Sequence, residues 1–430
     1  MSTGQSALPY GTIMQAKPES SGNSGTHSLR VAEARQSILD RLTPITGYEC
    51  VSVRNALGRV LASDVIAPCN VPAHDNSAMD GYAVRCADLS GETETMLDVV
   101  GSAFAGKPFS GIVSSGQAVR IMTGAPIPQG ADTIVVQEVA RSTGGRVAIP
   151  PGQQVRQNVR RAGEDLVAGG VAIPTGKMCG PAELGLIASL GLAEVVVYRR
   201  LRVAFFSTGD ELASIGKPLA PGEVYDSNRY TLFGELSRLG CEMLDMGVVR
   251  DDPDSLEAAF ASAAANADVI LTSGGVSVGE ADFIRELVNR LGEVAFWKID
   301  IKPGRPMAFG HVGSAWMFGL PGNPVAVMVT YYQFVHEALL KLSGVDPLPE
   351  PVLFEAVCAN AIAKRPGRRE FLRGRMSRAD GTLRVALTGA QGSGVLKSMS
   401  DADCFIILPE ERGDVPAGEK VLVQAFHGIV

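Results

Sequence analysis

The chain has 430 residues, a formal net charge of −7 and 46% apolar residues. The length predicts two to four domains with sizeable cores, and the negative charge argues against a general nucleic-acid binder. No apolar run approaches the ~18 residues of a membrane-spanning helix. The seven cysteines include no CxxC pair, which indicates reduced thiols in the cytoplasm and not a disulfide framework.

The N-terminal half is expected to hold a tail, a short helix and a β-rich region. Residues 1–27 are rich in Ser, Gly, Thr and Pro, which predicts a disordered tail. Apolar residues at helical spacing follow from Ser28 to Leu42, and Pro44 ends that pattern. From about residue 95 to 175, short alternating runs are broken by Gly and Pro, which is typical of β-structure.

The pattern changes at Leu201. Apolar strands then alternate with helical patterns, which predicts βαβ units and a doubly wound, mainly parallel sheet. The expected strands cover residues 201–208, 241–249, 268–273, 293–299 and 315–320. After Pro347 the helical patterns stop, and short strands with turns predict a small all-β domain.

Charged side chains follow the ends of these strands. Ligands bind at the carboxyl ends of parallel strands, so we expect the loops there to form one site. The loops carry the acidic residues Glu211, Asp251, Glu280 and Asp282 and the basic residues Lys298, Lys302 and Arg305. Acid beside base suits a cation together with a phosphorylated or oxyanionic substrate. The alternative is that these side chains cap helices or form a solvated rim.

A glycine-rich loop follows the strand at 268–273. It contains Ser273, Gly274, Gly275 and Ser277, and a helical pattern begins soon after it. A strand, a glycine turn and a helix start together point backbone N–H groups at an anion. The loop fits neither GxGxxG nor the Walker pattern, so it indicates neither a dinucleotide fold nor a P-loop kinase.

Four further turns have both a structural and a functional interpretation. KPGRP at 302–306 is a rigid turn that presents two cations, or a structural turn with solvated ends. Pro324 in LPGNP suits the first position of a helix, whose free N-terminus would attract an oxyanion. Asp210, Asp226 and Asn228 are helix caps or substrate-binding groups, and the last two would suit a heterocycle.

In this order, the motifs resemble one family, the molybdopterin molybdenumtransferases, meaning MoeA and the C-terminal domain of gephyrin. The matching stretches are VPAHDNSAMDGYAVR, RIMTGAPIPQGADTIVVQE, RRAGEDL, FSTGDEL, YDSNRY, TSGGVSVGEADF, KIDIKPGRPMAFG and GLPGNPVAV, extended by GRREFLRG and by Gln391 to Ser393. They span about residue 28 to 425. So many motifs in sequence make the resemblance specific.

The resemblance implies a role in molybdenum cofactor biosynthesis. The family inserts molybdenum from molybdate into adenylylated molybdopterin, releases AMP and requires a divalent cation such as Mg²⁺. It implies a cytoplasmic homodimer with an active site shared between subunits, and contacts with the adenylyltransferase of the same pathway and with molybdoenzymes. A non-catalytic molybdopterin-binding scaffold or carrier and the adenylyltransferase itself stay open as alternatives, as does tungstate in place of molybdate.

The resemblance also implies the domain order. Residues 28–70 and 146–180 would form an N-terminal linker domain, and residues 71–145 an inserted β-rich domain. Residues 181–346 would form the central α/β molybdopterin-binding domain, and residues 347–430 a small C-terminal β-barrel.

Carried over by motif, the resemblance assigns roles to residues of this chain. The expected catalytic residues are Asp80, Thr123, Glu164, Asp165, Glu211, Lys298 and Lys302, of which the first four would face the partner subunit's sheet edge. The expected substrate-binding residues are Asp210, Asp226, Asn228, Ser273, Gly274, Gly275, Ser277, Arg305, Pro321 and Pro324. Asp251 and Asp282 would hold Mg²⁺, because carboxylates are hard donors. Lys302 and Arg305 would attract molybdate.

Two features qualify this assignment. Ala326 departs from the family pattern, in which Ser commonly follows GNPV. If that hydroxyl contacts the oxyanion, this chain binds molybdate with one donor fewer. A basic group near the start of the last domain either recruits anion or lies on a solvated strand face; its members are Arg368, Arg369, Arg373 and Arg375.

Overall fold

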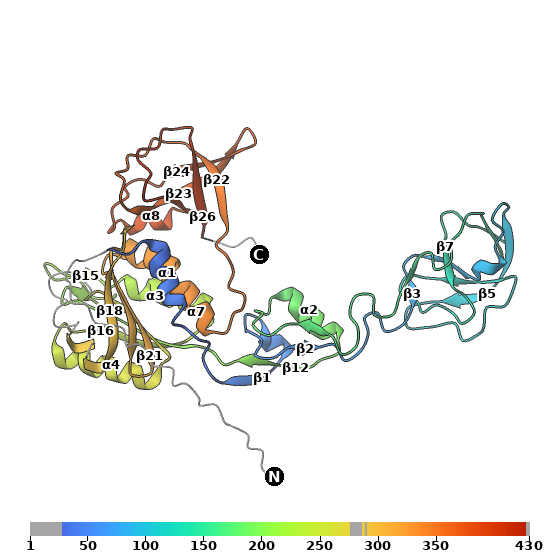
Figure 1. Cartoon of the computed structure of the whole chain (residues 1–430), viewed down its shortest axis with the longest axis horizontal. Coiled ribbons are helices and arrows are strands. Elements are labelled where there is room, and N and C mark those ends of the chain that lie inside the picture. The colour runs from blue at the N-terminus through green and yellow to red at the C-terminus, as the bar shows by residue number, and fades with distance from the viewer. Residues whose placement is uncertain (1–27, 276–285, 289, 427–430) are drawn as a thin grey trace, which may run out of the picture.

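The structure is a computed structural model and describes residues 28–275, 286–288 and 290–426. Figure 1 shows an elongated molecule, with an α/β lobe and a β-barrel at one end, a slender linker, and a β-rich lobe at the other end. The tail expected at residues 1–27 lies outside the described residues. None of the described helices combines the length and apolarity that crossing a bilayer requires.

The α/β lobe contains a six-stranded sheet with the order β16-β13-β17-β21-β20-β18. Its strands are β13 (Arg202–Thr208), β16 (Glu242–Val249), β17 (Val269–Ser273), β18 (Gly292–Lys298), β20 (Pro306–Val312) and β21 (Ala315–Leu320). The first four strands in the order pair in parallel, and β20 pairs antiparallel with β21 and β18. The mainly parallel sheet is confirmed, and β20 is an additional strand.

Helices cover both faces of this sheet, as a doubly wound fold requires. They are α3 (Asn228–Arg238), α4 (Pro253–Asn266), and a continuous run of α6 (Pro324–Thr330), a π-helical turn (Tyr331–Val335) and α7 (His336–Leu342). One buried cluster joins Phe205 and Leu271 to α3 and α6, and another joins Phe206 and Ile270 to α4. Neighbouring residues of one strand thus enter opposite cores, so these strands are continuous apolar runs in the sequence.

The C-terminal lobe is a closed five-stranded β-barrel, as expected. It consists of β22 (Leu353–Cys358), β23 (Arg369–Ala379), β24 (Thr382–Leu387), β25 (Cys404–Leu408) and β26 (Lys420–Ala425), with α8 (Leu396–Ser400) between β24 and β25. The barrel closes because β23 pairs with both β24 and β25. The short strand β19 (Ile301–Lys302), which follows β18, pairs in parallel with β23. Main-chain pairing therefore ties the barrel to the α/β lobe.

The β-rich lobe is a six-stranded sheet with the order β7-β4-β6-β5-β9-β8. Its strands are β4 (Gly81–Val84), β5 (Thr95–Ala103), β6 (Gln117–Ile121), β7 (Thr133–Val136), β8 (Arg141–Thr143) and β9 (Arg146–Ile149). Beside this sheet, β3 (Asn76–Ser77) pairs with β10 (Val159–Arg160). Because β9 pairs with β5 and β8, the sheet extends beyond the expected limit at residue 145.

The linker is built from two antiparallel strand pairs, a short 3-10 helix (Val53–Ala56) and one α-helix. The strand pairs and the α-helix are β1 (Tyr48–Ser52) with β12 (Glu194–Tyr198), β2 (Val65–Ile66) with β11 (Val171–Ile173), and α2 (Pro181–Ser189). The expected α/β domain began at residue 181, but α2 and β12 pack on the linker core. Conversely, α1 (Val31–Leu39), expected in the linker, packs into the α/β core. Periodicity identifies an element but not the core that it joins.

Candidate functional site

The strand ends of the α/β lobe and the facing wall of the barrel enclose a cleft of about 870 Å³. The parallel strands place their following loops at one edge, which is the arrangement expected from the sequence. Expected site residues that line the cleft are Glu211, Asp226, Asn228, Asp251, Ser273, Gly274, Gly275, Lys302, Pro321 and Pro324. The barrel contributes Arg368 and the segment 391–394.

Asp226 is a buried carboxylate in the wall of this cleft. Its side chain is only 2% exposed, and Oδ1 accepts hydrogen bonds from Ser207 Oγ at 2.9 Å and from the Arg229 N–H at 3.2 Å. Oδ2 is also buried, and it has no hydrogen-bond partner within the described residues. Asp226 therefore both caps the start of α3 and keeps one acceptor available.

Asn228 and Thr208 also have buried polar atoms without a hydrogen-bond partner among the described residues. Asn228 Nδ2 donates to Ser273 Oγ and to the Gly322 carbonyl, both at 2.7 Å. Asn228 Oδ1 and Thr208 Oγ1 are buried, and neither has a partner among the residues that the structure describes. Native proteins seldom leave buried polar atoms unpaired. These atoms, with Asp226 Oδ2, mark a surface prepared for the polar groups of a ligand.

Gly274 explains how the strand ends come so close together. Its φ is +93°, and a Cβ at this position would lie 2.4 Å from the Thr208 carbonyl oxygen, so only glycine fits here. Its N–H donates to the Leu320 carbonyl at 3.1 Å. This N–H is therefore used within the fold, and the expected anion cradle cannot draw on it.

The start of α6 is also used within the fold. Pro324 occupies the first helical position after Asn323, as expected, although the Asn323 side chain makes no capping hydrogen bond. The Val325 N–H donates to the Ser393 carbonyl of the barrel segment at 3.0 Å. A free helix N-terminus was expected here, but one of its donors joins the two walls of the cleft.

Lys302 is held at the cleft by the barrel. Its Nζ lies 3.1 and 3.2 Å from the two carboxylate oxygens of Glu370, which is only 4% exposed. The two residues are also register partners in the β19–β23 pairing. The lysine side chain remains 48% exposed, so a buried carboxylate fixes an ammonium group that a ligand can still reach. Arg368 adds a second cation to the cleft wall.

Several expected site residues are not brought into the cleft. Asp210 and Arg305 are exposed and lie outside the cleft lining, as does the half-buried Lys298, whose carbonyl accepts from the Leu29 N–H at 2.8 Å. Ser277 and Asp282 lie outside the described residues. Within the described residues, no group of three or more His, Cys, Asp or Glu side chains is placed to hold a metal ion.

Asp80 and Thr123 form a separate polar group on the β-rich lobe. Asp80 Oδ1 accepts from the Thr123 N–H and from Thr123 Oγ1, both at 2.8 Å. The hydrogen bonds from the Thr123 N–H and hydroxyl hold the pKa of Asp80 below its ordinary value. The side chain is therefore a partly exposed, oriented carboxylate at neutral pH.

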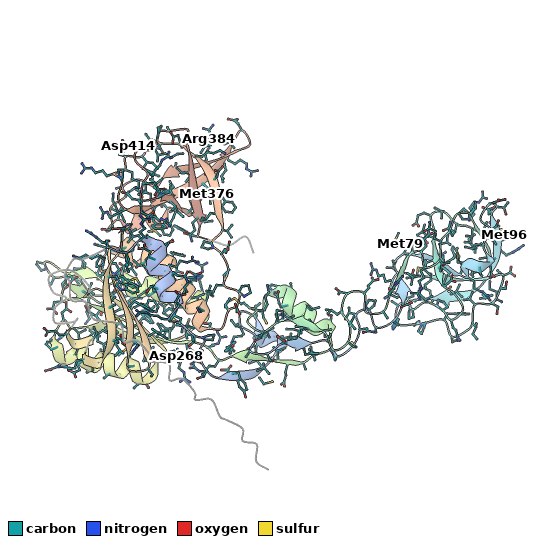
Figure 2. All side chains as sticks on the ribbon, in the orientation of Figure 1. Met79, Met96, Asp268, Met376, Arg384 and Asp414 are labelled. Atoms are coloured by element: carbon teal, nitrogen blue, oxygen red, sulfur yellow. The ribbon has the colours of Figure 1, made fainter. Side chains whose placement is uncertain are left out.

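Glu164 and Asp165 follow β10 and are exposed. Glu164 Oε2 accepts from the Arg161 N–H at 2.9 Å, and the Asp165 N–H donates to the Val71 carbonyl at 3.0 Å. In Figure 2, Met79, the neighbour of Asp80, is labelled on the β-rich lobe, far from Asp268 of the α/β lobe. The chain does not bring this lobe to its own cleft.

Sequence reasoning missed part of the cleft wall. Thr208, Tyr225 and Ser227 line the cleft next to expected residues, and the barrel adds Arg368 and the segment 391–394. Position after a strand could have indicated Thr208. The barrel residues reach the cleft only through tertiary packing. The motif resemblance was the signal for Gln391 to Ser393, whereas Arg368 belongs to the basic group for which anion recruitment was one of two interpretations.

Comparison with protein families assigns the whole architecture. Residues 29–191 match the MoeA N-terminal region (domain I and II), residues 204–341 a probable molybdopterin binding domain, and residues 355–426 the MoeA C-terminal region (domain IV). The boundary between the first two matches follows the structure, with α2 in the N-terminal part and β13 at the start of the central part.

Relatives and solved structures agree with this assignment. The chain is 44% identical to a molybdopterin molybdenumtransferase of Haemophilus influenzae, and the match covers 94% of this chain and 100% of the relative. It is 36% identical to the molybdopterin molybdenumtransferase of a Nostoc species, and that match covers 90% of this chain and 91% of the relative. A crystal structure of a molybdopterin biosynthesis moeA protein from Pyrococcus horikoshii matches 93% of this chain and 100% of its own, with a TM-score of 0.80 at 27% identity. The chain belongs to the molybdopterin molybdenumtransferase family.

Proposed function

We propose that the protein inserts molybdenum from molybdate into adenylylated molybdopterin, with release of AMP, and so completes the molybdenum cofactor. The observation that carries this proposal is the set of buried, unpaired polar atoms in a cleft with cations on its wall. Such a site suits a ligand that has a hydrogen-bonding ring at one end and negative charge at the other.

The ring would bind at the buried polar atoms. A pterin presents ring N–H and amino donors, and Asp226 Oδ2 and Asn228 Oδ1 are acceptors without partners among the described residues. Thr208 Oγ1 can donate or accept. Paired in this way, the ring would satisfy atoms that are costly to leave unpaired.

The negative charge would bind at the basic wall. Lys302 and Arg368 are the cations that line the cleft, and Glu370 holds Lys302 in place. A molybdate dianion or a phosphate placed between them gains charge-assisted hydrogen bonds. Because Glu370 fixes the ammonium beforehand, less side-chain entropy is lost on binding.

A divalent cation would suit the acidic side of the cleft. Asp251 and Glu211 line it with carboxylates, which are the hard donors that Mg²⁺ prefers. Asp251 would hold the ion together with Asp282, which lies outside the described residues. When bound, the cation would neutralise phosphate oxygens.

The acidic group on the β-rich lobe would act on a second copy of the chain. Asp80 directly precedes β4 and Thr123 follows β6 of the β-rich lobe, and Glu164 and Asp165 follow β10, which pairs with β3 beside that lobe's sheet. Figure 1 shows this lobe at the opposite end of the molecule from the α/β lobe and the barrel, which enclose the cleft. In a two-fold homodimer each lobe could reach the partner's cleft, and symmetry would produce two equal sites. We propose this homodimer as the active form.

The experiment is an AMP-release assay. Purified protein is mixed with adenylylated molybdopterin, Mg²⁺ and either molybdate or tungstate, and AMP and active cofactor are measured. The proposal predicts AMP release that depends on the oxyanion. Binding of the pterin without AMP release would indicate a scaffold or carrier, and ATP consumption with free molybdopterin would indicate an adenylyltransferase.

A further inference from the structure

Arg373 on β23 is a buried cation with an unusual environment. Its side chain is fully buried, with 0% exposure, and among the described residues no carboxylate pairs with it. Burial lowers the pKa of Arg373 to about 10, so the guanidinium stays protonated at neutral pH. Burying an unpaired charge is costly, and an apolar side chain would usually be more stable at such a position.

Within the described residues, the guanidinium hydrogen-bonds to the stretch 390–398 of the barrel, and its shortest bond goes to Gly392. Nη2 donates to the Gly392 carbonyl at 2.9 Å and to the Ala390 carbonyl at 3.4 Å, and Nε donates to Ser398 Oγ at 3.0 Å. Nη1 is buried without a partner in the part of the chain that the structure describes. The Arg373 N–H also donates to Gln391 Oε1 at 2.8 Å.

Gly392, one of these partners, belongs to the barrel's part of the cleft wall. Residues 391–394 line the cleft, and on their other side the Ser393 carbonyl accepts from the Val325 N–H at 3.0 Å. Arg373 and α6 therefore hold the segment from two directions. The cation lies directly behind the wall, separated from the cleft by one peptide group.

The orientation of that peptide group follows from its planarity. The bond between Gly392 and Ser393 is not among the cis bonds of the chain, and in a trans peptide the C=O and the next N–H point in opposite directions. The Gly392 carbonyl points at Arg373 inside the barrel. The Ser393 N–H thus points away from the barrel interior, towards the cleft, and no described backbone group accepts from it.

We propose that Arg373 is a positioning residue for the oxyanion: by fixing the Gly392 carbonyl it turns the Ser393 N–H into the cleft, and its charge makes that wall positive. The proposal rests on the proposed function, because the oxyanion in question is the molybdate substrate. A buried guanidinium polarises the peptide that it contacts, so the N–H on the opposite side becomes a stronger donor. Among the described residues no carboxylate pairs with this charge, so it adds to the field of Lys302 and Arg368.

The test compares Arg373→Met, Arg373→Lys and the matched control Arg375→Met. Arg375 lies on the same strand, is exposed and does not line the cleft. For each variant we would measure the KM for molybdate, the KM for the adenylylated pterin, kcat, the thermal midpoint, and the Kd for molybdate by equilibrium dialysis in the absence of pterin. A purely structural arginine would lower the thermal midpoint and leave both KM values unchanged.

We expect Arg373→Met to raise the KM and Kd for molybdate by about tenfold or more, as losing a charge-assisted interaction does, while the KM for the pterin stays within about twofold. Arg373→Lys keeps the charge but has only one nitrogen, so it should raise the molybdate KM about threefold. Arg375→Met should match the wild type. A folded Arg373→Met variant with the wild-type molybdate KM would overturn the inference.

Two further outcomes are decisive. If Arg373→Met does not fold, the lysine variant carries the test, and a folded Arg373→Lys protein with unchanged molybdate KM would overturn the inference. If the wild type releases no AMP, the proposed function fails, and the dialysis measurement still tests Arg373. Equal molybdate Kd values for wild type and Arg373→Met would then contradict the positioning role.

Discussion

The cleft and the acidic group on the β-rich lobe are held in very different ways. The cleft is fixed within one chain by the β19–β23 pairing, the contact of Lys302 with Glu370, and the hydrogen bond from Val325 to Ser393. The Asp80 group is carried at the other end of the molecule, beyond a slender linker (Figure 1). Under the proposed function, one chain preforms the ligand-binding half of the site, and we propose that a second copy supplies the other half.

The largest effect is expected in the preformed half, at Asp226. Asp226→Asn keeps the acceptor that Ser207 and Arg229 use but turns Oδ2 into a donor. The amide donor then faces the N–H donors of the pterin ring, which need an acceptor, so kcat/KM for the pterin should fall about 100-fold. Kinetic assays beside the exposed control Asp245→Asn would measure this loss. An Asp226→Asn enzyme within threefold of the wild type would remove Asp226 from the ligand site.

The next effect tests whether the barrel organises the cleft. Glu370→Gln removes the charge that holds the Lys302 ammonium, and kcat/KM should fall about tenfold because a charge-assisted contact is lost. Glu410→Gln is the matched control, since Glu410 pairs with Arg369 on the same barrel at 3.1 Å and does not line the cleft. If both glutamine variants lose the same activity in the AMP-release assay, Glu370 has no special role.

A third effect concerns the joint between linker and α/β lobe. Asp268 binds both Nη atoms of Arg199 at 2.7 Å, and Arg199 Nε donates to the Thr46 carbonyl at 3.0 Å. Asp268→Asn should lower the free energy of unfolding by about 2 kcal/mol, because the half-buried pair is broken. Urea unfolding followed by the fluorescence of Trp297 and Trp316, both in the α/β sheet, measures this change. The exposed pair of Arg202 and Glu242 offers Glu242→Gln as a control with little expected effect.

The same pair sets a pH dependence. Burial raises the pKa of Asp268, but hydrogen bonds from Arg199 and the Arg202 N–H, with their charges, outweigh burial and hold it below its ordinary value. The stabilisation is therefore complete above the pKa of an unfolded aspartate, about 3.9. It is lost as the pH falls through the lower, folded-state pKa. The stability difference between wild type and Asp268→Asn should shrink below about pH 4, and a constant difference down to pH 2 would contradict this account.

The smallest effect is expected at Ala326, which lines the cleft at the start of α6. Ala326→Ser adds a hydroxyl, and one additional hydrogen bond to molybdate should lower its KM about threefold. The competing outcome is that the hydroxyl bonds a carbonyl one turn earlier in the chain, that of Gly322 or Asn323, just before α6 begins. Steady-state kinetics with molybdate would then give an unchanged KM, and Ala326 would not limit oxyanion binding.

The sequence predicts the α/β half of the site because each loop of that half directly follows a strand of the sheet. Each strand end brings its own following loop, so Asp226, Ser273 and Lys302 could be placed at one edge from periodicity and topology. The use of the Gly274 and Val325 N–H groups by the fold could not be predicted, because it depends on how neighbouring strands and the barrel approach. The same limit applies to the strand β12, whose pattern does not reveal that it pairs with β1 in the linker.

The barrel's part of the cleft wall is the clearest example of what the sequence alone could not predict. Gly392 and Ser393 lie about 70 residues after Pro324 and Val325 in the sequence, yet they form the opposite wall of the same cleft. Arg373 was an arginine in a basic cluster, and a solvated strand face was an equally good interpretation. Its burial, which depends on the closure of the barrel, is what separates it from the exposed Arg375.

The most direct test of the central claim is complementation between two inactive variants. Asp226→Asn disables the cleft and Asp80→Ala removes the oriented carboxylate of the β-rich lobe, and each protein should be inactive as a homodimer. When the two are co-expressed, mixed dimers contain one intact site, so about a quarter of the wild-type AMP-release activity should return. Activity no higher than that of the separate variants would contradict a site shared between two copies of the chain.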